Sequence, residues 1–353
     1  MMTMETPIFT DDLEAALTMT ADSLQPDRIY MLTDSNVARC AESFAPSLLK
    51  NPRRRVITIP AGEENKNIDT LSYIWKELAG ASRSSLLCCL GGGMVCDVGG
   101  FAAATFKRGI PHINIPTTLL ACCDAAIGGK TGIDFNGAKN EVGAFAMPRA
   151  VIISSIPLST LPQAEILSGM GEMVKTALIA DRQLYCRMLN AASMTDDITG
   201  LADMAKKCAD IKCSIVRQDP DEQNLRRILN LGHTAGHAFE TFMLEKGTPV
   251  SHGAAVAHGI LVALILSHMK VNMPSQHIYS YASEFLKPLY PFIPFTCDDY
   301  PRLISTMMRD KKNRADSLAR FVLLSDIGMP VQSVAVNPKE IETALDIYRD
   351  IIS

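Results

Sequence analysis

The stretch SSLLCCLGGGMVCD, residues 84–97, is the most informative segment about the fold. It opens with a short apolar run of strand length, passes through three glycines, and leads into a helix expected to begin near Val98. The glycines allow close backbone approach to a ligand, and the amino end of the helix offers N–H groups to a phosphate. The pattern is not the GxGxxG of the usual dinucleotide site, so a tight structural turn explains it equally well. The stretch therefore predicts a strand–turn–helix unit of an α/β domain.

Four further runs of apolar and β-branched residues have the same length and are bounded by turn-forming residues. They are IYMLTD (29–34), RVITIP (55–60), INIPTT (113–118) and AVIISS (150–155). A helix with an apolar face is expected after Asn67, its predicted N-cap. Strands that alternate with helices predict a parallel sheet covered on both faces.

The pattern of apolar and polar residues changes after about residue 156, where helical periodicities follow one another. We expect helices over 161–179, 197–216, 224–243, 252–271, 275–288, 299–309 and 337–352, and one short strand, RFVLL, at 320–324. The predicted fold is an α/β domain over residues 1–155 and an all-α domain over 156–353. The apolar run around 254–268 contains His258 and is short for a bilayer span, so it predicts a buried helix.

Composition excludes several classes of protein. The chain has 353 residues, of which 47% are hydrophobic and 20% charged, so it has the make-up of a globular protein rather than a disordered one. The net charge of −4 does not favour a nucleic-acid partner. The ten cysteines form no CxxC pair and sit in apolar surroundings, which is typical of reduced core thiols in a cytoplasmic protein. The first residues do not have the pattern of a signal peptide.

The stretch ILNLGHTAGHAFE, residues 228–240, combines apolar residues with polar ones. On one continuous helix, Arg226, Asn230, His233 and His237 would share a face. A lone histidine there would be an ordinary core residue, but four aligned polar groups need partners, which a metal ion or an anionic ligand would supply. The HExxH pattern is absent, so further metal ligands must come from elsewhere. Glu172 and His252 are the candidates, and such a set with an open position is typical of catalytic zinc.

Lysines mark three more stretches. DAAIGGKTGIDFNGAKN, residues 124–140, has Lys130 and Lys139 in a glycine-rich loop, which suits a phosphate or carboxylate but lacks Walker A spacing, and a solvated loop is the alternative. Glu172 and Lys175 are helix neighbours in apolar company, so their ion pair is expected to be buried. RDKKNR, residues 309–314, is either a solvated basic loop or a cover for an anionic substrate.

Taken together, these segments make the chain resemble the 3-dehydroquinate synthase family of the sugar phosphate cyclase superfamily. The resemblance covers nearly the whole chain, because the order and the spacing of the motifs match together. It is densest at PAGEENKN (60–67), at residues 91–132, GAKNEVGAF (137–145), GMGEMVKTALI (169–179), LNLGHTAGHAFE (229–240) and SHGAAVAHG (251–259).

The resemblance implies a Rossmann-like NAD-binding domain, a helical metal- and substrate-binding domain, and a cleft between them. NAD contacts are implied for Asp34, Asn36, Glu63, Lys66, Gly92, Gly93, Asp97, Thr117, Thr118, Lys130, Lys139 and Thr160. A divalent metal, Zn²⁺ or Co²⁺, is implied on Glu172, His233 and His252. Catalytic and substrate contacts are implied for Asp124, Lys130, Lys139, Asn140, Lys175, Arg226, Asn230, His237, Arg108 and one of Lys311 and Lys312, with Lys312 preferred. Arg108 would reach the neighbouring subunit's site in a homodimer.

The implied reaction converts 3-deoxy-D-arabino-heptulosonate 7-phosphate to 3-dehydroquinate and phosphate in the shikimate pathway. It proceeds by transient NAD oxidation, phosphate elimination, re-reduction and intramolecular aldol closure. The chain departs from the family at Ala125, where serine is frequent, at Ala235 for a usual phenylalanine, and at Ala254 for the glutamate of HGEAVA. None of the three removes an implied metal ligand.

Three other functions remain open. Another sugar phosphate cyclase would keep the metal and NAD but lose groups that bind the carboxylate. A metal-dependent polyol or alcohol dehydrogenase of related fold would release NADH and would not need the lysines at 130 and 139. A non-catalytic homologue would have no need of the Glu172, His233 and His252 set, although such a set can persist without activity.

Overall fold

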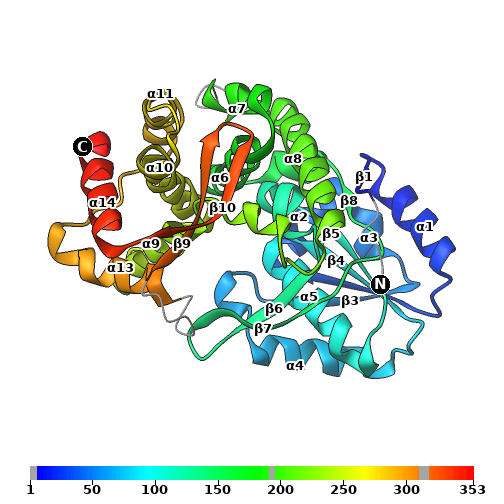
Figure 1. Cartoon of the computed structure of the whole chain (residues 1–353). Helices are drawn as coiled ribbons and strands as arrows, with labels where there is room; N and C mark the ends of the chain where they lie inside the picture. Colours follow the sequence, from blue (N-terminus) through cyan, green and yellow to red (C-terminus); the bar gives the residue numbers. More distant parts are fainter. Residues whose placement is uncertain (1–5, 191–194, 310–317) are drawn as a thin grey trace. The chain divides into compact units, whose positions relative to one another are not determined.

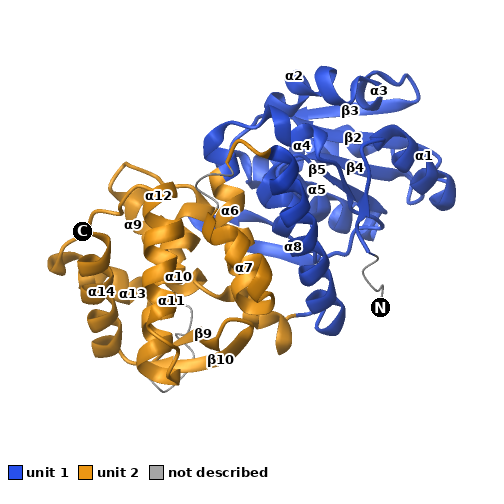
Figure 2. Cartoon of the chain, turned by 90° about the horizontal axis from the view of Figure 1, so that it is seen from above, with its two compact units in different colours: residues 1–166, 198–221 blue, residues 167–197, 222–353 orange. Residues whose placement is uncertain are grey.

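The computed structural model describes residues 6–190, 195–309 and 318–353 and divides the chain into two compact units. Unit 1 comprises residues 1–166 and 198–221, and unit 2 comprises residues 167–197 and 222–353 (Figure 2). The division differs from the predicted boundary at 155 in two respects. It falls eleven residues later, and helix α8 (Ile198–Gln218) belongs to unit 1 although its sequence follows two helices of unit 2. Lys311 and Lys312 lie outside the described residues.

A parallel sheet forms the centre of unit 1 (Figure 1). Its strands are β2 (Ile29–Asp34), β3 (Arg54–Ile59), β4 (Leu86–Gly91) and β5 (His112–Pro116), in the order β3-β2-β4-β5. A bridge from Asn114 to Val151 continues it toward β8 (Ile152–Ile153), which pairs with β1 (Ile8–Phe9). All five predicted strands are confirmed. The order reverses between β2 and β4, and ligands of such sheets bind at the carboxyl ends of the strands beside that point.

Helices cover both faces of this sheet, as the apolar strands predicted. They include α1 (Leu13–Leu24), α2 (Ser35–Phe44), α3 (Pro46–Lys50), α4 (Ile68–Glu77) and α5 (Gly93–Thr105). One core cluster joins the sheet to α4 and α5, and a second joins the opposite face to α1 and α3. The Asn67 side chain accepts hydrogen bonds from Asp69 and Thr70, which confirms the predicted N-cap. Helix α5 begins at Gly93, earlier than the predicted start near Val98.

Residues 130–145 form a β-hairpin, so the interpretation of 124–140 as a loop was wrong. Strand β6 (Lys130–Phe135) pairs antiparallel with β7 (Ala138–Phe145). The two-residue turn between them is Asn136-Gly137, with positive φ at both positions, 49° and 76°. Asn-Gly is the preferred sequence for that turn because both residues tolerate positive φ. The hairpin therefore holds Lys130 and Lys139 on a defined backbone.

The described residues of unit 2 are mostly helical and contain one β-hairpin, β9 (Ala319–Asp326) with β10 (Met329–Val336), of which the sequence predicted only one strand. Its helices are α6 (Gln163–Ala180, which begins in unit 1), α7 (Arg182–Leu189), α9 (His233–Glu245), α10 (His252–Val271), α11 (Gln276–Ser280), α12 (Lys287–Leu289), α13 (Tyr300–Arg309) and α14 (Pro338–Ile352). Among the described helices, α10 alone is long and apolar enough to cross a membrane. It is mostly buried against α9, α14 and β9, which confirms the predicted core helix.

The predicted single helix over 224–243 is broken, and that prediction was wrong. Leu225–Asn230 forms a 3-10 segment, and α9 begins only at His233. Gly232 between them has φ of 78°, which a residue with a side chain rarely adopts. A Cβ there would also lie 2.6 Å from the Ile260 side chain of α10. Close packing on α10 therefore requires a glycine break that apolar periodicity does not reveal.

The core of unit 2 contains His258, which is expected to make folding sensitive to acid. Its Nε2 donates to the Pro291 carbonyl (3.1 Å), and its Nδ1 accepts from the Tyr348 hydroxyl (2.7 Å). Burial lowers the pKa of His258 to about 4, so the unfolded chain binds the proton more readily. Neutral His258 stabilises the fold fully at pH values above its pKa in the unfolded chain, about 6.5. This stabilisation is lost as the pH falls toward 4.

We expect His258 to contribute about 2 kcal/mol to the loss of unfolding free energy between pH 8 and pH 5. The His258→Gln variant should be less stable at pH 8 because the packing and hydrogen bonds change. Between pH 8 and pH 5, the unfolding free energy of the variant should nevertheless fall by about 2 kcal/mol less than that of the wild type. Urea titrations at pH 5, 6.5 and 8 would measure both effects, and equal pH slopes in the variant and the wild type would refute the assignment.

Candidate active site

Three helices of unit 2 bring the predicted metal ligands together. Glu172 lies on α6, and His233 and His252 are the first residues of α9 and α10. The Glu172 Oε1 atom lies 3.6 Å from His233 Nε2 and 3.1 Å from His252 Nε2. Two ligand atoms each about 2.1 Å from one tetrahedral metal ion are about 3.4 Å apart. The residues present therefore fit a divalent metal.

The far nitrogen of each imidazole has a partner that orients the ring. His233 Nδ1 lies 3.2 Å from the Leu231 carbonyl oxygen, an acceptor, so this nitrogen carries the proton. His252 Nδ1 lies 3.5 Å from Glu240 Oε2. A proton on Nδ1 of each ring would leave Nε2 to bind a metal, which is the arrangement usual for metal-binding histidines. Without a metal, His252 Nε2 also carries a proton and donates it to Glu172.

The charges of this cluster favour a cation. Glu172 is 1% exposed and pairs with Lys175 at 2.6 Å, which confirms the predicted buried ion pair. Burial works against the charged carboxylate, but Lys175 and the two histidines hold the pKa of Glu172 well below its usual range. Burial lowers the pKa of His233 to about 3. Burial opposes a charge on His252 as well, yet hydrogen bonds with Glu172 and Glu240 raise the pKa of His252 to about 10. The site thus attracts positive charge at the position between Glu172 and His252.

His237 is a third nitrogen donor at the same place. One turn after His233 on α9, its ring centroid lies 5.3 Å from that of His233 and 5.8 Å from that of His252. One ligand atom from each of the three histidines lies within 4.8 Å of the others. His237 is exposed whereas Glu172 is buried, so His237 is the one placed to meet a ligand from solvent.

Arg226 and Asn230 do not share a helix with the histidines, contrary to the prediction, because the chain breaks at Gly232. Arg226 is nevertheless 1% exposed. The Asn230 amide donates to Glu222 Oε1 at 3.1 Å. Both residues lie in the 3-10 segment that leads directly into His233, so the sequence neighbourhood was informative although the predicted helix was not.

Glycines allow α10 to pack closely enough on α6 and α9 to assemble the ligands. A Cβ on Gly253 would overlap the Ser168 carbonyl oxygen of α6, and one on Gly259 would overlap the carbonyl oxygen of Gly232. On the facing helix, a Cβ on Gly171 would overlap the Gly253 carbonyl oxygen. The backbones therefore touch without intervening side chains. This contact sets the separation of Glu172 and His252.

In unit 1, four of the residues implied in NAD binding lie at the carboxyl ends of β2 and β4, on either side of the switch in strand order: Asp34, Asn36, Gly92 and Gly93. Asp34 ends β2, and its Oδ1 accepts hydrogen bonds from the backbone of Asn36 (2.8 Å) and of Val37. Gly92 is the N-cap of α5, whose first N–H groups receive no side-chain cap. The arrangement matches the usual position of a nucleotide in a doubly wound sheet.

Two observations test whether a nucleotide phosphate fits here. A Cβ on Gly92 would lie 3.0 Å from the Thr118 side chain, so a larger residue would fill the cradle. The Thr117 hydroxyl is buried and has no hydrogen-bond partner within the described part of the chain. Thr118 accepts from the Ala121 N–H, and Thr160 donates to the Pro157 carbonyl oxygen. The open cradle and the unsatisfied hydroxyl fit a bound phosphate.

Lys66 joins two more of the implied NAD residues, Glu63 and Asp97, to the implied substrate residue Asn140. It is 3% exposed, and its Nζ lies 2.6 Å from both Asp97 Oδ2 and Asn140 Oδ1, and 3.5 Å from Glu63. Burial alone would lower the pKa of Lys66, but the carboxylates of Asp97 and Glu63 outweigh it and raise the pKa. Burial raises the pKa of Asp97 in spite of the ammonium group. Asn140, on the β6–β7 hairpin, is thereby tied to the carboxyl edge of the sheet.

Lys212 is a functional candidate that the sequence analysis missed. Its side chain is 7% exposed, and its Nζ lies 2.8 Å from Asp124 Oδ2 and 2.7 Å from the Asp124 carbonyl oxygen. Asp124 lies in the π-helical turn Ala121–Ala125, which follows Thr118 in sequence. The signal was present in the sequence: Lys212 continues the apolar stripe of α8 after Leu201, Ala205 and Cys208. A lysine in a buried stripe needs an anionic partner.

Three further predicted residues are exposed. Lys130 and Lys139 lie on the hairpin, and Arg108 lies on a turn where Lys107 and Arg108 have φ of 50° and 66°.

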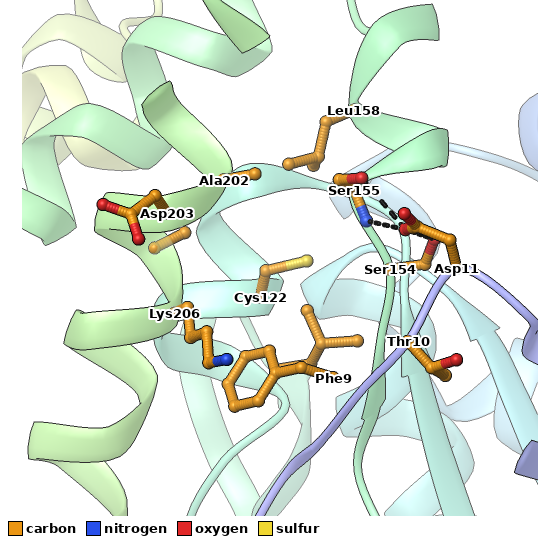
Figure 3. Close-up of a pocket in the computed structure, with 12 residues that line it drawn as sticks. Phe9, Thr10, Asp11, Cys122, Ser154, Ser155, Leu158, Ala202, Asp203 and Lys206 are labelled. Atoms are coloured by element: carbon orange, nitrogen blue, oxygen red, sulfur yellow. Dashed lines mark hydrogen bonds between the residues drawn. The ribbon is translucent and has the colours of Figure 1, made fainter. Parts of the chain in front are cut away.

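A separate pocket of about 260 Å³ lies in unit 1, under α8 and at the carboxyl ends of β1 and β8 (Figure 3). Asp11 accepts hydrogen bonds there from Ser154 and Ser155, and Lys206 lies over the Phe9 ring. The pocket contains none of the predicted site residues.

Solved structures with a similar fold include two sugar phosphate cyclases and, at lower TM-scores, dehydrogenases such as a glycerol dehydrogenase from Schizosaccharomyces pombe (TM-score 0.65, 18% identical, covering 99% of this chain and 90% of that one). A 2-epi-5-epi-valiolone synthase from Streptomyces hygroscopicus subsp. jinggangensis 5008, with NAD⁺ and Zn²⁺ bound, has a TM-score of 0.87 and is 23% identical, covering 99% of this chain and 98% of that one. A 2-deoxy-scyllo-inosose synthase in complex with carbaglucose-6-phosphate, NAD⁺ and Co²⁺ has a TM-score of 0.83 and is 24% identical, covering 97% and 96%. The predicted fold class, an α/β domain followed by a helical one, is thereby confirmed, although the β9–β10 hairpin makes the second domain mostly helical rather than all-α.

Sequence comparison is more specific. The family model for the N-terminal part of 3-dehydroquinate synthase matches residues 56–168, and the model for the C-terminal part matches residues 169–313. A 3-dehydroquinate synthase from Parabacteroides distasonis is 41% identical over 341 residues, which cover 96% of each chain. The chain belongs to the 3-dehydroquinate synthase family, as its motifs indicated.

Proposed function

We propose that this chain converts 3-deoxy-D-arabino-heptulosonate 7-phosphate to 3-dehydroquinate and phosphate, as an NAD- and divalent-metal-dependent carbon–oxygen lyase. The observation that carries the proposal is the convergence of His233 Nε2 and His252 Nε2 on Glu172 Oε1 in unit 2. Relatives named 3-dehydroquinate synthase, 37–41% identical, support the substrate.

Unit 1 would bind NAD at the switch point of its sheet. Asp34 and Asn36 would meet the adenosine ribose, and the N–H groups at the start of α5 would meet the pyrophosphate. The other contacts would come from Glu63, Lys66, Gly92, Gly93, Asp97, Thr117, Thr118, Lys130, Lys139 and Thr160. When bound, NAD supplies a reversible hydride acceptor, and a divalent metal on Glu172, His233 and His252 supplies a Lewis acid.

The chain's own cations would hold the two anionic ends of the substrate. Lys175 and Arg226 are both buried in unit 2, where a fixed charge is strong because water is excluded. Asn230 and His237 would donate hydrogen bonds to substrate hydroxyls. Further contacts are proposed for Asp124, Lys130, Lys139, Asn140, Lys212 and one of Lys311 and Lys312. Phosphate would leave by elimination, with its own oxygens as base, so the residues mainly position the substrate.

A phosphate-release assay tests this function. Purified protein with the heptulosonate phosphate and NAD should release phosphate without accumulating NADH, and chelation of the metal should slow release by about 100-fold or more. Added Zn²⁺ or Co²⁺ should restore the rate. Accumulation of NADH with simple polyols, and no phosphate release, would instead identify a dehydrogenase. Release from a different sugar phosphate only would identify another cyclase.

We further propose a cytoplasmic homodimer in which Arg108 reaches the partner's site. The free cysteines support a reducing compartment. The turn that carries Arg108 adjoins a pocket of about 400 Å³ that includes Gly109 and Phe145, and Phe145 is 53% exposed. A second copy of the chain would cover this apolar surface. Sedimentation analysis of wild type and Phe145→Asp tests the dimer, and a monomeric wild type would refute it.

A further inference from the structure

Glu240 is a buried carboxylate with no role in the reaction described above. Glu240 lies on α9 and is 8% exposed. Its Oε2 atom lies 3.5 Å from Nδ1 of His252, the nitrogen opposite the one that faces Glu172. A buried carboxylate is costly unless it is paired, so its position beside an imidazole needs an explanation.

The helix geometry explains how Glu240 reaches this position. Glu240 follows His233 by seven residues, so both side chains emerge on the same face of α9 two turns apart. His252 opens α10, which packs on α9 through the glycine contacts at Gly259 and Gly236. Helix α9 therefore carries one candidate metal ligand and also contacts the far side of another. At position 254, two residues after His252, the chain has alanine and provides no second carboxylate.

We propose that Glu240 is a positioning residue that orients His252 and keeps its proton on Nδ1, so that Nε2 is presented to a divalent metal. The inference rests on the metal site proposed above. A carboxylate that accepts the far N–H of a metal-binding histidine fixes the ring and makes the other nitrogen a better donor. Loss of such partners typically costs 10- to 100-fold in metal affinity, roughly.

Two substitutions separate the orienting hydrogen bond from the charge. In Glu240→Gln the amide oxygen still accepts the N–H, but the negative charge is gone. In Glu240→Ala both are lost. Glu245→Gln is the matched control, because Glu245 lies on the same helix five residues later, is exposed, and pairs with Arg302 away from the histidines. Thermal melting of the metal-free proteins shows whether each variant folds.

The measurement is Co²⁺ affinity, obtained by competition with a chromophoric chelator, together with the visible absorption of the bound Co²⁺. We expect Glu240→Ala to bind Co²⁺ roughly 10- to 100-fold more weakly and with an altered spectrum. Glu240→Gln should fall between it and wild type, and Glu245→Gln should match wild type. The same order should hold for Zn²⁺.

The outcomes distinguish the two proposals. Wild-type affinity and spectrum in Glu240→Ala, with affinity lost in His233→Ala, would overturn the positioning role and leave the metal site standing. Equally weak Co²⁺ binding by all variants and by wild type would overturn the metal site itself. Equal losses in Glu240→Ala and Glu245→Gln would show a general effect on α9 and would also overturn the positioning role.

Discussion

His233→Ala is expected to lose metal binding and to slow phosphate release by at least about 1,000-fold. The substitution removes one of the two imidazole nitrogens that face Glu172 Oε1. A Lewis acid contributes several kcal/mol to transition-state stabilisation, and about 1.4 kcal/mol corresponds to each tenfold change in rate. Metal content and initial rates of phosphate release measure the two losses. His233 stands at the first position of α9, so alanine should leave the fold intact, which circular dichroism would verify.

The matched control is His268→Ala on the exposed, carboxyl-terminal part of α10, where His268 Nδ1 contacts the Met273 carbonyl at 2.8 Å. This variant should keep its metal and its rate, with at most a small loss of stability. Full activity in His233→Ala would refute the metal site. Equal losses in the two variants would point to general damage to the helices.

Gly253→Ala should have the second largest effect, although no side chain that touches a ligand is removed. The added Cβ would overlap the Ser168 carbonyl oxygen, so α6 and α10 must move apart. Overpacking of this kind costs about 1–3 kcal/mol of stability. Because Glu172 and His252 stand on the two separated helices, a shift of about 1 Å should lower the rate of phosphate release by about 100-fold. Urea unfolding and the phosphate assay measure the two effects.

Gly80→Ala is the control for the substitution itself. Its Cβ would come closest to the flexible end of Arg28, at 3.2 Å, and Gly80 belongs to unit 1, whereas the contact at Gly253 belongs to unit 2. Little change in activity is expected there. Wild-type rates in Gly253→Ala would show that the helix separation does not set the geometry of the site.

The local structure around several key residues could be predicted from sequence because short-range physics determines it. Periodicity located the five strands, and Asn67 and His252 stand at the predicted starts of α4 and α10. The motifs located Glu172, His233 and His252 through family resemblance. The turn at Asn136-Gly137 could also have been recognised, because that dipeptide is itself a hairpin signal.

Other features depended on contacts between distant segments. The break at Gly232 arises from close packing on Ile260, and a chain with the same apolar period would otherwise continue as one helix. Lys212 can be recognised as a candidate site residue only in the folded chain, where α8 packs in unit 1 and Lys212 contacts Asp124, 88 residues away in sequence. Burial of that lysine could be inferred from periodicity, but its partner could not.

Local sequence patterns are enough to identify residues that could bind a metal and a nucleotide, and the helices that carry Glu172 and His252. The tertiary structure alone decided that Glu172, His233 and His252 meet, and that Glu240 lies behind one of them. The physical reason is that helix propensity and apolar periodicity act over a few turns. The distance between ligands on three helices is set by backbone contacts at glycines, which no local pattern encodes.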